Sequence, residues 1–337
     1  MPAGLHRTPV VYASTMAKRL SIDDRVDALA KLRRGPSSPE AVQATTAGLA
    51  DKSNLVVAKA AVVARELMTT SLVPNLVTAF DRFIHEPTED KGCAALTAIV
   101  ETLQTFAASE SAVFLRGIHH VQMEGSYGGS VDAAVKLRCE SAFGLVRMGY
   151  RDVMWELAAL LADADRECRI AAARGIGHSM ADAGLPLLKY KILSSGMDNE
   201  VTAECLASLI QINAEKSIPF LAPHLDSPDV ALRDAAALAL GGTRRPEAFD
   251  LLRQSYERRI DSEFRSVLLL AMAMQRTEPA IGFVVSVIAG GDSRTAVNAI
   301  KALALYRREE AIRARIAEAV KIRNDVMVGK TFEVEFR

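Results

Sequence analysis

Hydrophobic positions recur along this chain in blocks that begin about every 32 residues. Six blocks align on Arg138, Arg169, Thr202, Arg233, Arg265 and Val297, with spacings of 31, 33, 31, 32 and 32 residues. Within each block the positions one before, three after and seven after the aligned residue share one helical face, because steps of four residues nearly match a helical turn. A repeat of this length is typical of stacked helical hairpins.

The three positions carry apolar side chains almost throughout. The slot before the aligned residue holds Leu137, Cys168, Val201, Leu232, Phe264 and Ala296. The slot three after it holds Ser141, Ala172, Cys205, Ala236, Leu268 and Ile300, and the slot seven after it holds Leu145, Ile176, Leu209, Leu240, Met272 and Ala304. Such a stripe cannot be buried by one helix alone. Each helix is therefore predicted to pack against a partner in its own repeat and against the next repeat.

The segments between the blocks predict the partner helices. They cover residues 153–161, 187–193, 218–225, 249–256, 281–288 and 312–316. Pro186, Pro219, Pro246 and Pro279 stand near the starts of four of them, where a missing amide hydrogen costs least. Helix is thus expected to follow helix through most of the chain.

Acidic residues stand four positions before several aligned residues. They are Asp165, Asp198, Asp229 and Asp261. This position suits a helix N-cap, whose carboxylate accepts hydrogen bonds from free amides of the first turn. The same spacing allows a carboxylate to contact the guanidinium of Arg169, Arg233 or Arg265. A structural role thus explains these acids without catalysis.

The stretches DRECRIAAARGIG and SPDVALRDAAALALGG, each with an Asp, an Arg and an alanine-rich second helix, resemble HEAT repeats, including the bacterial subtype known from phycobilisome lyase-like proteins. The resemblance covers roughly residues 40–325 and is strongest from Arg138 onward, with looser copies at 55–64 and 90–100. It implies an all-α fold, an α-solenoid of stacked antiparallel helical hairpins in a HEAT-like superhelix. The family contains scaffolds, adaptors, lyase chaperones and a few enzymes, so the resemblance implies a fold and no single activity.

The expected organisation is one continuous solenoid over residues 21–325. Residues 1–20 are expected to be loose, and Ser21 with Asp24 is similar to a capping box that begins the first helix. Residues 326–337 form a tail that ends in TFEVEFR, where Phe332, Val334 and Phe336 alternate in strand fashion. A lone strand needs a partner edge, so this segment is expected to pair with another chain or, preferably, to be disordered or loosely packed.

Composition narrows the function classes. Lys plus Arg and Asp plus Glu both number 41, so no net field draws the chain to nucleic acid or to anionic lipid. No apolar run approaches the roughly 20 residues that cross a bilayer, which predicts a cytoplasmic protein. Cys93, Cys139, Cys168 and Cys205 lie in predicted second helices without a CxxC pair, so buried reduced thiols are expected. The single tryptophan, Trp155, lies in an amphipathic helix and is expected in the core.

The repeat pattern breaks once, before Arg138. The aligned position near Lys91 precedes Arg138 by 47 residues, about 15 more than the period, and the excess centres on residues 117–132. Insertions in repeat arrays emerge on one face, which often binds. Candidate partner-binding residues here are His119, His120, Gln122, Glu124, Tyr127 and Asp132. A metal held by His119, His120 and Glu124 is disfavoured because adjacent histidines on a helix diverge. The alternative to a binding loop is a structural loop over an irregular junction.

Basic residues follow the second helices and predict a cationic edge along the turns between repeats. The candidates for partner binding are Arg151, Arg244, Arg245, Arg276, Arg307 and Arg308, with Lys216 nearby. The alternative is structural, because cations at helix C-termini offset the negative end of the helix dipole by roughly 0.3 to 1 kcal/mol each.

No catalytic constellation accompanies the repeats. The chain has no GxSxG elbow or cysteine-protease signature, and GSYGG at 125–129 lacks the lysine of a phosphate-binding loop. We therefore predict a non-catalytic scaffold or adaptor that binds another protein and needs no cofactor, metal or membrane. A lyase-like or chaperone protein acting on a cofactor-bearing protein is the first alternative. Nucleic-acid binding through the arginine edge is the weaker one, because aromatic residues make up only 5% of the chain.

Overall fold

The computed structural model describes residues 20–32, 38–194 and 198–337. Residues 1–19, which the sequence predicts to be loose, lie outside this part of the chain, as do 33–37 and 195–197. In the described residues helices dominate, and the only strands are the two of a short hairpin. Contacts divide the chain into two compact units, residues 1–106 and 107–337.

The first unit contains five α-helices among its described residues: α1 (Ile22–Leu32), α2 (Pro39–Leu49), α3 (Asn54–Glu66), α4 (Val73–His85) and α5 (Ala94–Thr105). The capping box predicted at its start is formed, because the Asp24 amide donates to Ser21 Oγ at 3.0 Å and the Ser21 amide donates to Asp24 at 3.1 Å. The looser repeats predicted at 55–64 and 90–100 correspond to α3 and α5, which pack against each other.

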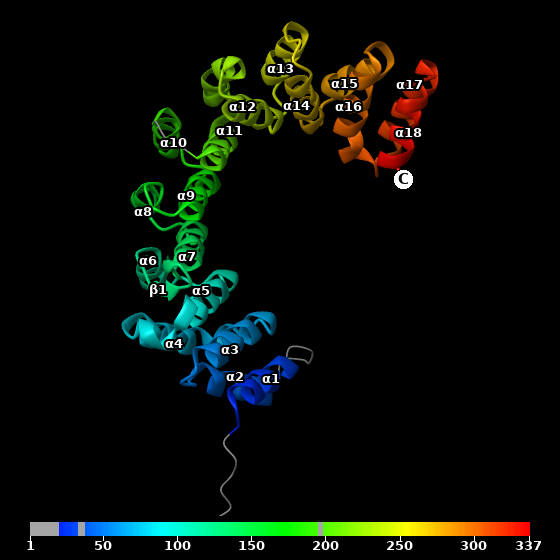
Figure 1. Cartoon of the computed structure of the whole chain (residues 1–337). Coiled ribbons are helices and arrows are strands. Elements are labelled where there is room, and N and C mark those ends of the chain that lie inside the picture. The colour runs from blue at the N-terminus through cyan, green and yellow to red at the C-terminus, as the bar shows by residue number, and fades with distance from the viewer. Residues whose placement is uncertain (1–19, 33–37, 195–197) are drawn as a thin grey trace, which may run out of the picture. The chain divides into compact units, whose positions relative to one another are not determined.

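The second unit contains the six aligned repeats. Its helices are α6 (Ser111–Ile118), α7 (Val135–Arg147), α8 (Val153–Leu160), α9 (Arg166–Ser179), α10 (Gly184–Leu193), α11 (Asn199–Leu221), α12 (Val230–Gly241), α13 (Pro246–Arg258), α14 (Ser262–Met274), α15 (Glu278–Gly290), α16 (Ser293–Leu303), α17 (Glu310–Arg323) and α18 (Val326–Glu335). The second helices of successive repeats, from α7 through α9, α11, α12, α14 and α16 to α18, pack side by side. Within this unit the first helices form another row beside them (Figure 1).

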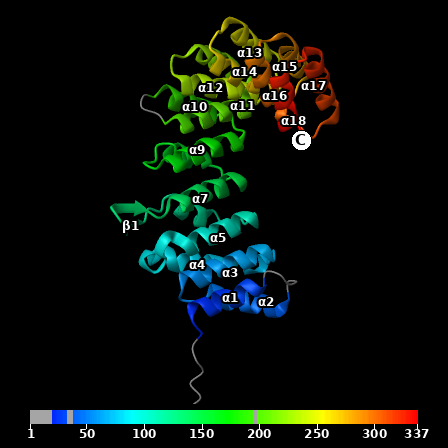
Figure 2. The same ribbon diagram turned by 45° about the vertical axis from the view of Figure 1, so that its right-hand side comes forward.

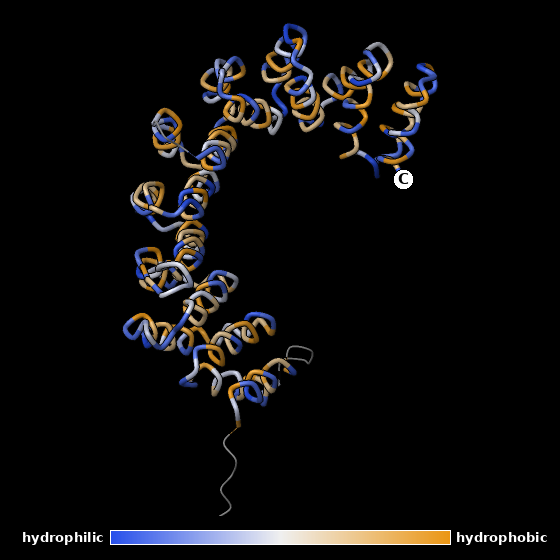
Figure 3. The backbone as a smooth tube through the Cα atoms, viewed as in Figure 1, coloured by the Kyte–Doolittle hydropathy of each residue, from blue (hydrophilic) through white to orange (hydrophobic). Residues whose placement is uncertain are grey.

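The predicted apolar stripe is the core of this unit. Sixteen of its eighteen positions are buried, and Leu232 and Ala304 are half-buried. Along the helices apolar and polar stretches alternate, as an amphipathic helix requires (Figure 3). The buried stripes of neighbouring helices remove one another from water, which is the main driving force for stacking repeats. The predicted all-α solenoid of antiparallel helical hairpins is confirmed.

The predicted helix caps are also formed. The carboxylates of Asp165, Asp198, Asp229 and Asp261 accept hydrogen bonds from amides of the first turn of α9, α11, α12 and α14 at 2.8 to 3.0 Å. The guanidinium groups of Arg169 and Arg233, however, do not contact the capping carboxylate of their own repeat. Arg169 donates to the carbonyls of Asp163 and Ala164, and Arg233 reaches Asp261 of the following repeat at 3.3 Å.

The C-terminal tail contradicts the strand pattern, because residues 326–335 form helix α18. Asp325 caps it, accepting from the Met327 amide at 2.9 Å, and α18 packs on α16 as the second helix of a further repeat. Val328 and Phe336 are buried, whereas Val334 is 62% exposed. The period of the buried side chains is therefore helical, and the apparent alternation of the sequence is incidental.

The cysteines fit the prediction from the sequence, whereas the single tryptophan does not. Cys93, Cys168 and Cys205 are buried, Cys139 is half-buried, and all four are free thiols, as predicted. Trp155 is not in the core, because it lies on α8 with 79% of its surface exposed. None of the described helices combines the length and the apolar character that a membrane span requires.

Candidate functional site

The insertion at 117–132 forms a β-hairpin between α6 and α7. Strands β1 (Met123–Ser126) and β2 (Gly129–Asp132) pair antiparallel, with Met123 opposite Asp132 and Ser126 opposite Gly129. Gly128 in the two-residue turn has φ +103°, a conformation that favours glycine. Figure 2 shows β1 extending away from α7. Sequence reasoning located this insertion but did not predict its strands.

Arg138 of α7 fixes the base of the hairpin. Its guanidinium, with only 4% of the side chain exposed, lies 2.6 Å from Asp132 Oδ2 and 3.1 Å from Asp163 Oδ2, and donates to the His120 carbonyl at 3.0 Å. The other Asp132 oxygen accepts from the amides of Gln122 and Ala134 at 3.1 and 2.9 Å. A buried guanidinium requires compensation of its charge, and Asp132 and Asp163 provide it. Its two terminal nitrogens donate hydrogen bonds, while the buried Nε lies beside Asp163 without one.

The charge of Asp132 reflects the same network. Burial alone would raise the pKa of this carboxyl, but hydrogen bonds from Ala134, Arg138 and Gln122 outweigh it and hold the pKa below its usual range. The two acidic neighbours raise the pKa of Arg138 against the opposing effect of its burial. The hairpin base is therefore an ionised cluster at neutral pH.

The predicted polar residues of the insertion bind neighbours and do not converge on one point. His119 Nε2 lies 2.7 Å from Glu156 of α8, whereas His120 Nε2 lies 3.2 Å from Gln122 Oε1. Gln122 in turn donates to Glu124 at 2.6 Å. In the described part of the chain, no three His, Cys, Asp or Glu side chains are grouped as metal ligands.

Apolar side chains of the hairpin and of α8 are left in solvent. We call Val121, Met123, Tyr127, Val131 and Trp155 the hairpin surface, and they are 60%, 60%, 109%, 53% and 79% exposed, respectively. The hairpin surface includes both faces of the hairpin, because Met123 pairs with Asp132 and Val131 pairs with Glu124. The His119–Glu156 contact joins the hairpin base to α8, and a cavity of about 210 Å³ lies there, lined by His119, Val121 and Glu156 among others. Sequence reasoning included Tyr127 but missed Trp155, because an amphipathic pattern does not reveal which flank of a helix a neighbouring helix covers.

The six candidate arginines follow second helices, in the turns where the sequence places them, and all are exposed. Arg244 and Arg276 come near the same side chain, since both positive charges act on the Tyr306 hydroxyl, whose pKa is raised mainly by burial. Arg276 also lies over the Tyr306 ring at 5.9 Å. Arg245 pairs with Glu215 at 3.4 Å. Arg244 and Arg276 therefore both lie within electrostatic range of Tyr306.

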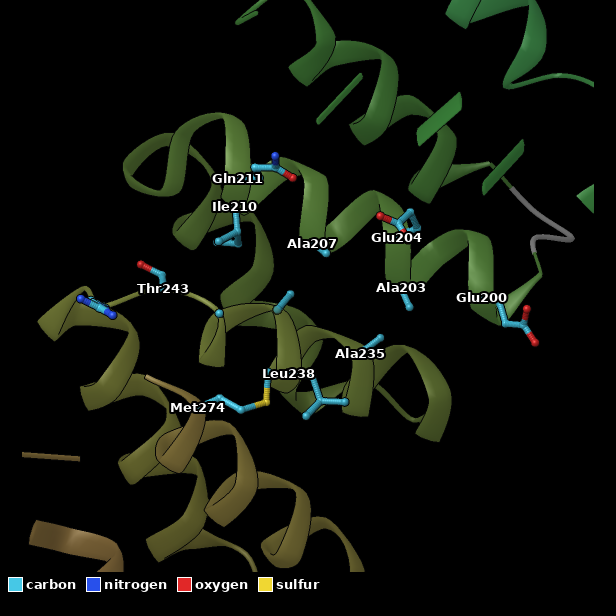
Figure 4. Close-up of a pocket in the computed structure, with 13 residues that line it drawn as sticks. Glu200, Ala203, Glu204, Ala207, Ile210, Gln211, Ala235, Leu238, Thr243 and Met274 are labelled. Carbon is cyan, nitrogen blue, oxygen red and sulfur yellow. The ribbon is translucent and has the colours of Figure 1, made fainter. Parts of the chain in front are cut away.

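A groove of about 800 Å³ between α11 and α12 was not foreseen from the sequence. Ala203 and Ala207 of α11 face Ala235 of α12 across it (Figure 4). Arg244 and Thr243 line it toward the end of α12, and Glu200 and Glu204 line it toward the start of α11. The only hint of the groove in the sequence was a pair of alanines four residues apart, Ala203 and Ala207. Small residues at this spacing also suit close packing of two helices, so they did not indicate a groove.

The fold and these sites define an α-solenoid protein of stacked helical hairpins. Residues 190–273 match the family model described as HEAT repeats. This part of the chain is therefore similar to HEAT repeats, and the helical hairpins on both sides of it continue the same stacked arrangement. A comparison with curated proteins gives no match.

Solved structures show a more distant likeness. The complex of CpcE and CpcF of phycocyanin lyase from Nostoc sp. PCC7120 is 20% identical, with 68% of this chain and 87% of that chain covered and a TM-score of 0.35. An engineered protein is 19% identical, with 93% of both chains covered and a TM-score of 0.37. The Pds5–Scc1 complex is 11% identical, with 97% and 75% covered and a TM-score of 0.32. Likenesses at this level say nothing about what the present chain binds.

Proposed function

We propose that this protein is a non-catalytic scaffold that binds another protein, and that the hairpin surface makes the central contact. The observation that carries the proposal is the contrast between the base and the tip of the hairpin. The base is fixed by Arg138 through Asp132 and the His120 carbonyl, while Tyr127 at the tip is fully exposed. A rigidly held apolar projection loses little conformational entropy on binding, which favours affinity.

The exposed aromatic residues support a protein partner. Tyrosine and tryptophan are enriched at the centres of protein interfaces, where they contribute a large share of the binding energy. Tyr127 and Trp155 are both available for such contacts. A loop whose task was to cover a repeat junction would bury its tip against the helices, so the exposed tip supports the binding role over the structural one.

The groove and the arginines extend the proposed surface. The alanine-lined groove between α11 and α12 offers an apolar recess for partner side chains, and Arg244 at its rim offers a charge for an acidic group. Extended preformed surfaces of this kind are how repeat proteins bind without any reacting group. Binding at the groove is a separate contact that can be tested independently of the hairpin.

The experiment is affinity purification with mass spectrometry on the full chain, followed by affinity measurements with the recovered protein. The test variant combines Met123→Ser and Tyr127→Ser, which leave the Arg138 network intact. The matched control is Ile260→Ser with Ile322→Ser, because these apolar residues are 95% and 69% exposed elsewhere. We expect the test variant to bind at least about tenfold more weakly, which corresponds to about 1.4 kcal/mol, and the control to bind normally. Equal affinity of wild type, test variant and control would refute the hairpin contact.

A further inference from the structure

Two thiols lie side by side where α7 packs against α9. The sulfur atoms of Cys139 and Cys168 are 3.9 Å apart, although the residues are 29 positions apart in sequence. Cys139 is half-buried and is reached from solvent, whereas Cys168 is fully buried. Both are free. The repeat architecture therefore brings together a pair that the spacing of the cysteines in the sequence does not suggest.

The separation is close to what a covalent bond needs. A disulfide has a sulfur–sulfur distance of about 2.05 Å, so the two atoms must approach by roughly 1.9 Å. Rotation of a cysteine side chain between staggered conformers moves its sulfur by a comparable amount. Helices α7 and α9 pack against each other, and this packing holds the two sulfur atoms at the observed distance.

The surroundings of the pair shift the pKa values of the two thiols in opposite directions, which favours Cys168 as the sulfur that attacks an oxidised Cys139. The S–H group of Cys139 donates to Cys168, and this hydrogen bond with the nearby Arg138 charge lowers the pKa of Cys168 against the opposing effect of burial. The same hydrogen bond raises the pKa of Cys139. The thiolate, and not the thiol, is the nucleophile in such an attack. By contrast, burial raises the pKa of the Cys205 thiol to about 12.

We propose that Cys139 and Cys168 are a redox modification site, which a hydroperoxide converts into an intrachain disulfide between α7 and α9. Cys139, the member that solvent reaches, attacks one peroxide oxygen through its sulfur, the O–O bond breaks, and the leaving oxygen takes up the thiol proton as water or an alcohol. The second sulfur then attacks the resulting sulfenic acid. The S–S bond forms, the S–O bond breaks, and water leaves with the remaining thiol proton. Two thiols are oxidised and one peroxide is reduced.

The position of the pair gives the modification a structural consequence. Cys139 follows Arg138 directly, and the charge of Arg138 is one of those that stabilise the Cys168 thiolate. Oxidation removes the titratable Cys168 thiol from the surroundings of the guanidinium that fixes the hairpin base. The disulfide also ties the helix that carries Arg138 to the next repeat.

The test treats the purified full chain with hydrogen peroxide, alkylates the remaining thiols after denaturation, and maps the peptides by mass spectrometry. We expect a monomer that has lost the mass of two hydrogen atoms, with the Cys139 and Cys168 peptides linked. Cys205 should stay alkylatable, and dithiothreitol should restore all thiols. Separately alkylated Cys139 and Cys168 peptides after oxidation, or either cysteine recovered as a sulfinic acid or linked to a different chain, would overturn the proposal.

Variants separate the pair from general oxidation. Cys139→Ser changes the half-exposed member and should abolish the linked peptide while the helical circular dichroism signal stays unchanged. The matched control, Cys205→Ala, removes a buried thiol outside the pair and should keep the linked peptide. A linked peptide that contains Cys168 in the Cys139→Ser variant would show that Cys139 is not its partner. This test does not depend on the partner-binding proposal.

Discussion

Arg138 is the aligned residue of the first of the six repeats, yet its side chain binds the base of the hairpin. Its guanidinium is nearly excluded from solvent and bridges Asp132 of the hairpin to Asp163 before α9. An arginine buried to this extent is destabilising unless every contact is made. The sequence identifies Arg138 as a landmark of the repeat, but its partners come from three separate segments and become visible only in the fold.

The Asp132→Asn variant tests this network and its pH dependence. Because the folded-state pKa of Asp132 lies below that of the unfolded chain, its stabilisation is complete above the unfolded value, about 4, and is lost as the pH falls through the lower folded value. We expect the variant to lower the free energy of unfolding at pH 7 by about 1 to 3 kcal/mol. Urea denaturation at several pH values should show the gap to wild type closing toward acid pH. A gap that is constant with pH would contradict the assigned charge.

Gly117 makes a second residue-scale prediction, because α6 and α7 approach closely at this point. A Cβ atom on Gly117 would lie 2.2 Å from Ser141 Oγ, which is buried and has no hydrogen-bond partner. We expect Gly117→Ala to destabilise the protein by about 1 to 3 kcal/mol through overpacking.

The Gly117→Ala, Ser141→Ala double variant should regain part of the lost stability, because removal of the hydroxyl also removes the nearest clash. Urea denaturation measures this difference. Gly290→Ala is the control, since no atom lies within 4 Å of its added Cβ, and it should leave stability unchanged or slightly raised. Equal losses at both glycines would show that the cost is not steric.

At the scale of elements, the repeat period predicted nearly all helices of the second unit and its buried stripe. It succeeded because buried side chains at steps of four residues have few other arrangements. The hairpin was located only as an excess of length, since four-residue strands rich in Gly and Ser carry little periodic signal. The groove and the exposure of Trp155 were missed because both depend on how far adjacent helices separate, which local pattern does not record.

Helix α18 shows how a short pattern misleads. Phe332, Val334 and Phe336 fit alternation, but Val328, Phe332 and Phe336 fit steps of four equally well, and Asp325 stands at the cap position of the earlier repeats. Seven residues were too few to choose between the periods. The acid four positions before the next expected aligned residue was the signal that would have settled the choice.

Two alanine substitutions distinguish the helix from a strand. Phe336 is 1% exposed and Val334 is 62% exposed, although an alternating strand would place them on one side. We expect Phe336→Ala to cost about 3 kcal/mol of stability and Val334→Ala less than about 0.5 kcal/mol. Thermal or urea unfolding of the two variants measures the difference. Comparable losses would favour the strand.

The groove between α11 and α12 gives a prediction about binding rather than stability. Ala207 is exposed on its floor, so Ala207→Trp fills the recess without disturbing the core. We expect the purified partner to bind about tenfold more weakly, or about 1.4 kcal/mol, with the melting temperature unchanged. Ala314→Trp, at an exposed alanine of α17, is the control and should bind normally. Undiminished affinity of the Ala207 variant would remove the groove from the interface.

At the scale of the whole molecule, stability in a repeat protein is close to a sum of terms between neighbouring helices. A cut between compact units should therefore be tolerated better than a cut within one. The contacts place the boundary of the two units after Phe106. Within the second unit, α9 packs extensively on α11, so a cut in the segment between α10 and α11 separates helices that bury each other's apolar stripe.

This difference predicts the behaviour of fragments. Residues 107–337 expressed alone should keep a helical circular dichroism spectrum and unfold cooperatively in urea, because they contain all six aligned repeats and the α18 cap. Residues 1–194 should be less stable and should bind the dye ANS more strongly, since the cut exposes the face of α9 that α11 covers. An unfolded 107–337 fragment together with a well-folded 1–194 fragment would contradict this prediction. The boundary at Phe106 would then not separate independently stable units, and the repeats themselves would be the cooperative units.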